Sequence, residues 1–184
     1  YFGAALVSAM VAIIARRRRT VPGAQALSGL MIGVTIWAIC DGLESAFVPM
    51  QAKILLSKLS HVGIQSVPVL FLFFTIGYTQ RQEWLTPRRI AALWVVPVLA
   101  VLLVFTNEWH RLIWRNIQPV SLPTGIELYF DHGPAFWVVA AYDYTLILIG
   151  TLLLFYTLLR QHDLYRRQAG VLVVHGRADA PLPG

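Results

Sequence analysis

Apolar stretches as long as a membrane span are the feature that most constrains this chain. A helix needs about 20 predominantly apolar residues to cross the hydrocarbon core of a bilayer. Stretches of about that length lie at residues 24–47, 53–79, 90–106 and 134–159. A shorter one, residues 1–15, precedes four consecutive arginines, and we expect it to be a span truncated at its N-terminus. A signal peptide would place its basic residues before the apolar core. The prediction is an all-α fold, a polytopic transmembrane bundle of about five spans.

The composition agrees with a membrane protein. Hydrophobic residues make up 57% of the 184 residues and charged residues 13%, and the mean hydropathy is +0.63. This is more apolar surface than one soluble core of that size can bury. The lipid bilayer is therefore the first expected partner.

Every second connection between these stretches has few basic residues, namely Lys53, Arg111 and Arg115. Most of the other arginines fall in the alternate connections. They are residues 16–19, then Arg81, Arg88 and Arg89, then Arg160, Arg166 and Arg167. Cytoplasmic loops carry an excess of Lys and Arg. The pattern therefore predicts cytoplasmic loops near 16–23 and 80–89, a cytoplasmic segment after residue 160, and an extracytoplasmic loop at 107–133. The N-terminus is then extracytoplasmic, and the chain is a multi-pass protein of a bacterial cytoplasmic (inner) membrane.

The net charge of +6 would also suit a nucleic-acid-binding protein. This positive charge is, however, spread over one membrane face and is not gathered with exposed aromatic residues on a folded surface. We therefore exclude nucleic acid as a partner. The single Cys40 lies within the second span and carries no information about disulfides.

Two local signals refine the predicted helices. Pro87 comes just before the fourth span, where a helix tolerates a missing N–H. Gly29 and Gly33 are four residues apart and allow another helix to approach closely. We interpret them as an ordinary packing seam within the bundle and not as a dimerisation motif.

Ionisable residues inside the spans call for a partner or a purpose, because a charge in hydrocarbon is costly. Asp41 and Glu44 share a face of the second span, and Lys58 shares one with His61 and Gln65 on the third. At about 1.5 Å per residue, these residues and Asp143 on the last span lie in one layer near the outer surface. One interpretation is a structural ion pair between Lys58 and either Glu44 or Asp41.

The second interpretation is a ligand cavity open to the outside, with Asp41 and Asp143 as its floor. The two interpretations do not exclude each other. The candidate ligand-binding residues are Trp37, Asp41, Glu44, Lys58, His61, Gln65, Trp109, His110, Tyr142, Asp143 and Tyr144. The ligand is an unidentified small molecule.

No cofactor or metal is expected. A haem held between helices commonly has two axial ligands, and no second histidine lies at the depth of His61. Glu108, His110, Asp131 and His132 flank the outer loop, but they lack the spacing of a zinc site.

The outer loop itself predicts a short extracytoplasmic β-hairpin. β-branched and aromatic residues lie on both sides of "SLPTG", whose Pro123 and Gly125 favour a turn. Trp109, Trp114 and Trp137 would anchor the hairpin at the headgroup level. We expect Trp109, His110 and the hairpin 115–131 to cap the polar layer.

Three groups of residues are specific enough to compare with known families. They are "TNEWHRLIW" at the end of the fourth span, the set Lys58, Gly63 and Pro68, and "GPAFWV" followed by Tyr142 and Tyr144. They resemble the seven-helix N-terminal sensor region of bacterial histidine kinases and related diguanylate cyclases. The resemblance extends from the first span to about residue 174.

The resemblance implies that residues 1–174 form a non-catalytic input module, which binds a ligand and relays helix movement to a cytoplasmic output domain. Residues 175–184 are then a cytoplasmic tail or a truncated end, because "HGRADAPLPG" does not suit a span. Kinase and cyclase motifs are not recognisable, so the chain itself is not predicted to be an enzyme.

Two alternatives stay open. The chain is either part of a longer sensor or a shortened relative that serves as an accessory structural subunit of a larger membrane complex, for instance an energy-converting one. In the second case its partners are other membrane subunits.

Overall fold

The predicted class, a bundle of transmembrane helices with one small hairpin, is confirmed. The structure is a computed structural model and describes residues 1–46, 49–122 and 125–178. Its elements are α1 (Phe2–Arg17), α2 (Ala24–Ala46), α3 (Met50–Tyr78), the short 3-10 helix η1 (Gln82–Trp84), α4 (Pro87–Phe105), α5 (Asn107–His110), β1 (Trp114–Leu122), β2 (Gly125–His132) and α6 (Pro134–Ala178).

Four helices in the described ranges are long and apolar enough to cross a membrane: α2, α3, α4 and the part of α6 from Pro134 to Arg160. Helix α1, with 16 residues, is the shorter fifth element. Each predicted span thus corresponds to one helix, with ends that differ by a few residues. Phe47, the predicted last residue of the second span, lies outside the described residues.

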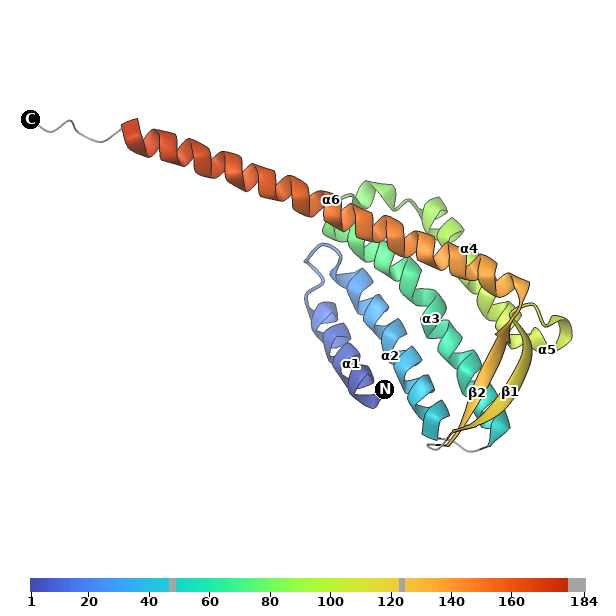
Figure 1. Cartoon of the computed structure of the whole chain (residues 1–184). Coiled ribbons are helices and arrows are strands. Elements are labelled where there is room, and N and C mark those ends of the chain that lie inside the picture. Colours follow the sequence, from blue (N-terminus) through green and yellow to red (C-terminus); the bar gives the residue numbers. More distant parts are fainter. Residues whose placement is uncertain (47–48, 123–124, 179–184) are drawn as a thin grey trace, which may run out of the picture.

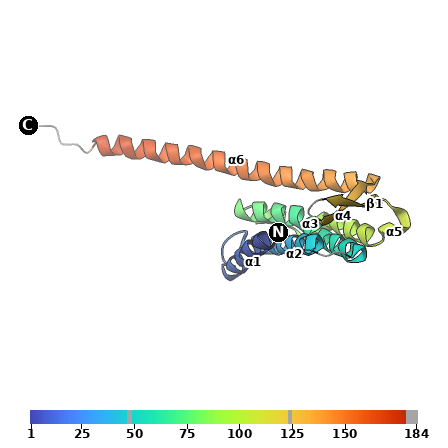
Figure 2. The same ribbon diagram turned by 60° about the horizontal axis from the view of Figure 1, so that its bottom comes forward.

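The helices form a layer with α6 lying across it. Helices α1, α2 and α3 pack in chain order, and α3 also contacts α4 and α6. Figure 2 shows α6 above the layer that contains the other helices. Because successive helices alternate in direction, the connections that carry Arg16–Arg19 and Arg81–Arg89 lie at one end, and the hairpin lies at the other (Figure 1).

Helices α2 and α3 approach closely along a seam of glycines. A Cβ atom at Gly33 would lie 3.4 Å from the carbonyl oxygen of Gly63, and one at Gly29 would lie 3.3 Å from Leu70. A Cβ atom on Gly63 would overlap the Gly33 carbonyl and lie 2.8 Å from the backbone nitrogen of Trp37. The predicted packing seam within the bundle is therefore confirmed.

Two apolar clusters hold α6 and the hairpin in place. Val69, Leu72 and Ile76 of α3 pack with Leu146 of α6 in the first cluster. The second joins Val104 of α4 to Ile113 and Trp114 at the start of the hairpin.

The predicted hairpin is confirmed. Strands β1 and β2 are antiparallel, with Gln118 opposite Tyr129, and the pairing shifts by one residue between Trp114 and Asn116. Residues 123 and 124, where the turn was predicted, lie outside the described residues. Pro87 begins α4 as predicted, and the Thr86 hydroxyl accepts a hydrogen bond from the Arg89 backbone N–H.

The segment after residue 160, which is predicted to be cytoplasmic, continues the last span as a helix. Helix α6 continues through Arg166 and Arg167 to Ala178 without interruption and extends beyond the other helices (Figure 1). The physical reason is local: the sequence contains no proline between Pro134 and Pro181, and leucine, arginine and glutamine favour the helix. The predicted tail from residue 175 thus begins inside this helix, and residues 179–184 lie outside the described part.

The glycine seam yields a stability prediction. Gly63→Ala forces α2 and α3 apart, and we expect it to lower the free energy of unfolding by about 1–3 kcal/mol. Gly3→Ala is the matched control, because a Cβ atom there meets nothing within 4 Å. The measurement is reversible unfolding in mixed micelles. A Gly63→Ala variant as stable as the control would contradict the observed seam.

Candidate ligand-binding cavity

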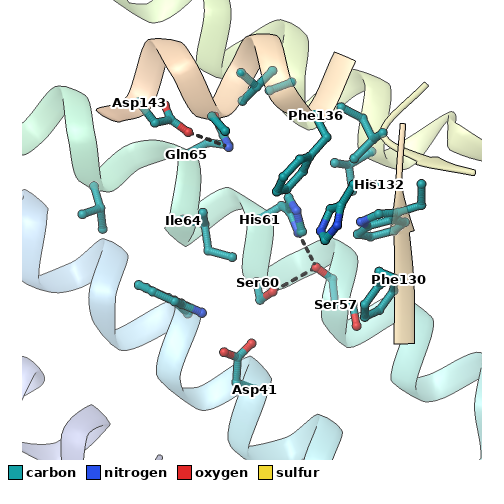
Figure 3. Close-up of a pocket in the computed structure, with 18 of the residues that line it drawn as sticks. Asp41, Ser57, Ser60, His61, Ile64, Gln65, Phe130, His132, Phe136 and Asp143 are labelled. Carbon is teal, nitrogen blue, oxygen red and sulfur yellow. Dashed lines mark hydrogen bonds between the residues drawn. The ribbon is translucent and has the colours of Figure 1, made fainter. Parts of the chain in front are cut away.

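A cavity of about 600 Å³ lies between α2, α3 and α6 beneath the hairpin. Figure 3 shows Asp41 of α2 on one side of α3 and Asp143 of α6 on the other, with His61 between them. The polar residues that line the cavity are Tyr1, Asp41, Glu44, Ser45, Lys53, Ser57, Ser60, His61, Gln65, Glu127, His132, Asp143 and Tyr144. Of the residues in the predicted layer, all but Lys58 line this cavity.

The cavity wall on α3 is a stripe of polar side chains three or four residues apart, which places them on one helix face. The Ser57 hydroxyl lies 2.8 Å from Oε2 of Glu44, and the Ser57 carbonyl accepts a hydrogen bond of 2.9 Å from Ser60. Nδ1 of His61 lies 2.8 Å from the same carbonyl. A carbonyl only accepts, so Nδ1 carries hydrogen in this contact.

Asp143 joins α6 to this stripe. Nε2 of Gln65 donates a hydrogen bond of 3.2 Å to Oδ2 of Asp143, which is drawn in Figure 3. Oε1 of Gln65 and Oδ1 of Asp143 are buried and have no hydrogen-bond partner in the described part of the chain. Unpaired buried acceptors are rare in proteins and call for an explanation.

The lysine in the cavity wall binds the backbone of α2. Nζ of Lys53 donates a hydrogen bond of 2.6 Å to the main-chain oxygen of Glu44. Because the last carbonyls of a helix lack partners within the helix, an ammonium group there is favourable. Lys53 therefore links α3 to the backbone of α2, whereas the Glu44 carboxylate accepts its hydrogen bond from Ser57.

Aromatic residues of the hairpin and α6 form the roof. The ring centroids of His61 and Trp114 are 5.1 Å apart in an edge-to-face arrangement, and those of Trp114 and Phe130 are 4.8 Å apart. The rings of His132 and Phe136 stack at 3.8 Å. These contacts bind the roof directly to the polar stripe of α3.

Asn107 fixes the chain where it leaves α4. Its Oδ1 accepts hydrogen bonds from the backbone N–H groups of Ile113 and Trp114, and its Nδ2 donates to the Trp114 carbonyl. The side chain is only 6% exposed. The buried side-chain amide of Asn107 thus holds the start of the hairpin against the end of α4.

The predicted ion pair of Lys58 with Glu44 or Asp41 is wrong. Nζ of Lys58 lies 2.5 Å from Glu108, which follows α4, and 3.4 Å from the Phe105 carbonyl at the end of α4. The carboxylate and the free carbonyl at this helix end both attract the ammonium group. The hydrogen bond from Lys58 lowers the pKa of Glu108. The pair joins α3 to the end of α4.

Seven of the eleven candidate site residues line the cavity: Trp37, Asp41, Glu44, His61, Gln65, Asp143 and Tyr144. The other four lie elsewhere. Besides Lys58, Tyr142 donates a hydrogen bond to the Leu93 carbonyl, and His110 contacts Thr106 and the backbone of Leu112. Trp109 is 87% exposed. The cap therefore consists of the hairpin and not of Trp109 and His110.

Several lining residues were not predicted. Ser57 and Ser60 could have been found, because they share the face of α3 that carries His61 and Gln65. Leu128, Phe130 and His132 alternate along β2 and so share one face of the strand. That signal is useful only once the hairpin is known to fold over the helices.

The described residues contain no group of three or more His, Cys, Asp or Glu side chains that could hold a metal ion. His132 lines the cavity, whereas Glu108 pairs with Lys58. The residues considered for zinc are thus divided between different contacts.

A family model described as the N-terminal 7TM region of histidine kinase matches residues 1–176 of the chain. No curated protein and no solved structure matches the chain. The family match covers all the helices and the hairpin that surround the cavity.

The hydrogen bonds of Asn107 give a prediction for the exchange rates of two backbone amides. Asn107→Leu leaves the N–H groups of Ile113 and Trp114 without their acceptor, at a cost of about 1–3 kcal/mol for each unsatisfied group. We expect amide hydrogen exchange at Ile113 and Trp114 to become about tenfold faster or more. Asn116→Leu is the control, since Asn116 bonds only the next N–H, of Ile117. Equal exchange in the two variants would contradict this role.

Proposed function

Because the chain belongs to the family of N-terminal 7TM regions of histidine kinases, we propose that it binds a small ligand in the polar cavity and relays helix movement to a cytoplasmic output domain. The family supports the general role, a membrane sensor module without catalytic activity of its own. The ligand site and the relay are our proposal. The proposed module comprises residues 1–174.

One observation carries the proposal: the helix that lines the cavity is also the helix that leaves the bundle. Phe136, Ala140, Asp143 and Ile147 of α6 line the cavity, and α6 continues without a break to Ala178 (Figure 1). A rigid helix transmits a displacement along its length, so a ligand that moves the cavity wall also moves the far end.

The join between α6 and the bundle is polar near the cavity and apolar further along the helix. Near the cavity, Gln65 donates a hydrogen bond of 3.2 Å to Asp143 of α6, and one acceptor on each of these two side chains has no partner among the described residues. Deeper in the bundle, Leu146 packs into an apolar cluster. A ligand that satisfies the acceptors would stabilise one position of α6 over another, which is the differential affinity that a switch requires.

We propose that the hairpin is extracytoplasmic and that the protein lies in a bacterial cytoplasmic membrane with its N-terminus outside. The support is the separation of charge along the bundle. The connections with Arg16–Arg19, Arg81, Arg88 and Arg89 lie at the end opposite to the hairpin (Figure 1). A positively charged end is typical of the cytoplasmic side.

Filling the cavity tests the function. We expect Ala140→Trp, which places an indole in the cavity, to change autophosphorylation of the full-length protein in nanodiscs by about fivefold or more, in the range of typical allosteric coupling. Ala141→Trp is the matched control, because Ala141 is exposed and Ala140 lines the cavity. Output that is equal in Ala140→Trp, the control and the unchanged protein would overturn the proposed relay.

Orientation is tested by thiol labelling in intact cells, with Cys40 replaced by alanine. Tyr129 on the hairpin is 62% exposed, and Gln82 lies exposed in the connection at the opposite end. We expect a membrane-impermeant reagent to label Tyr129→Cys at once and Gln82→Cys only after the cells are permeabilised. The reverse pattern would invert the proposed topology.

A further inference from the structure

We propose that the ligand of the cavity is an organic cation, a primary ammonium group attached to an apolar or aromatic body. This inference rests on the proposed function, since it assumes that the cavity is a ligand site. It adds the chemical class of the ligand, which follows from the charges, the hydrogen-bonding groups and the apolar surface of the lining.

The charges of the lining favour a cation. Four carboxyl side chains line the cavity, Asp41, Glu44, Glu127 and Asp143, against the single lysine, Lys53. The ammonium of Lys53 is already bound to the main-chain oxygen of Glu44. A cationic ligand would offset the remaining negative charge, because charges interact more strongly inside a protein than in bulk water.

Two buried atoms without hydrogen-bond partners in the described ranges are an independent observation that also favours a cationic ligand. Gln65 is only 5% exposed, and its Oε1 has no hydrogen-bond partner in the described ranges. Oδ1 of Asp143 shares this property. Both atoms are acceptors, so a group that satisfies them must be a donor. An ammonium group supplies three N–H donors and no acceptor.

The rest of the lining fits an organic body. Ile64, Val67, Pro68, Val139 and Ile147 provide apolar surface, while Trp37, Phe130 and Phe136 provide aromatic rings. Aromatic faces attract cations, and apolar walls favour a hydrocarbon part. A bare metal ion suits the site poorly, because no three potential ligands come together among the described residues.

The test compares three ligands of one shape. 2-Phenylethylamine, 2-phenylethanol and 3-phenylpropanoate carry a cation, a neutral hydroxyl and an anion on the same aromatic body. Binding to the full-length protein in nanodiscs is measured by calorimetry, with empty nanodiscs subtracted to remove partition into lipid. We expect the amine to bind about tenfold more tightly than the alcohol or better, and the anion to bind least.

Two substitutions locate the binding. We expect Asp143→Asn and Gln65→Leu each to reduce the affinity for the amine by about tenfold or more. Glu83→Gln is the control, because that carboxylate is exposed in η1 at the end of the bundle opposite to the hairpin. The control should bind the amine with unchanged affinity.

The outcomes separate this inference from the proposed function. Equal or tighter binding of the alcohol or the anion would overturn the cationic class while supporting the cavity as a ligand site. Amine binding that survives both Asp143→Asn and Gln65→Leu would overturn the assignment to these acceptors. If none of the three ligands binds, the inference fails, and the output of Ala140→Trp decides separately whether the cavity controls the kinase.

Discussion

Polar groups inside a hydrocarbon layer must find their partners within the protein, and helix α3 concentrates this requirement. Its stripe of Ser57, Ser60, His61 and Gln65 cannot face lipid without cost. The surrounding elements each bring a matching group: α2 supplies Glu44 to Ser57, α6 supplies Asp143 to Gln65, and the hairpin supplies Trp114 to His61. The arrangement of the bundle around α3 follows from these matches and from the close approach that the glycine seam permits.

The pairing of polar groups is incomplete at one contact of α3, and the acceptors left there determine which ligands the cavity favours. The acceptors on Gln65 and Asp143 that lack partners in the described part of the chain lie where α6 meets α3. A fully packed apolar interface there would be more stable but indifferent to ligands, because a rigid interior has one arrangement. The hairpin keeps this polar space covered, and Asn107 and the pair Lys58–Glu108 hold both ends of its entry segment to the bundle.

The sequence predicts the helices and the layer of polar residues well, because both depend on local pattern: span length, helical spacing and the distance from a helix end. It places Asp41, His61, Gln65 and Asp143 at a common depth, and the structure brings them to one cavity. It fails for Lys58 because depth does not determine the direction of a side chain around the helix axis. Glu108 comes close to Lys58 because α4 packs against α3, and this contact depends on tertiary structure. The extension of α6 beyond residue 160 was not predicted, because the spans were assigned from hydropathy and the segment with Arg160, Arg166 and Arg167 is polar.

Water access to the cavity tests the central claim most directly. Ile64 lines the cavity, whereas Val69 on the same helix is fully buried in the apolar cluster. In nanodiscs, where both membrane faces are open, a small charged thiol reagent can be applied to Ile64→Cys and Val69→Cys in a protein without Cys40. A hydrated cavity predicts rapid modification of Ile64→Cys and none of Val69→Cys. Two equally unreactive cysteines would show that the space beneath the hairpin is packed or sealed, and would contradict the account.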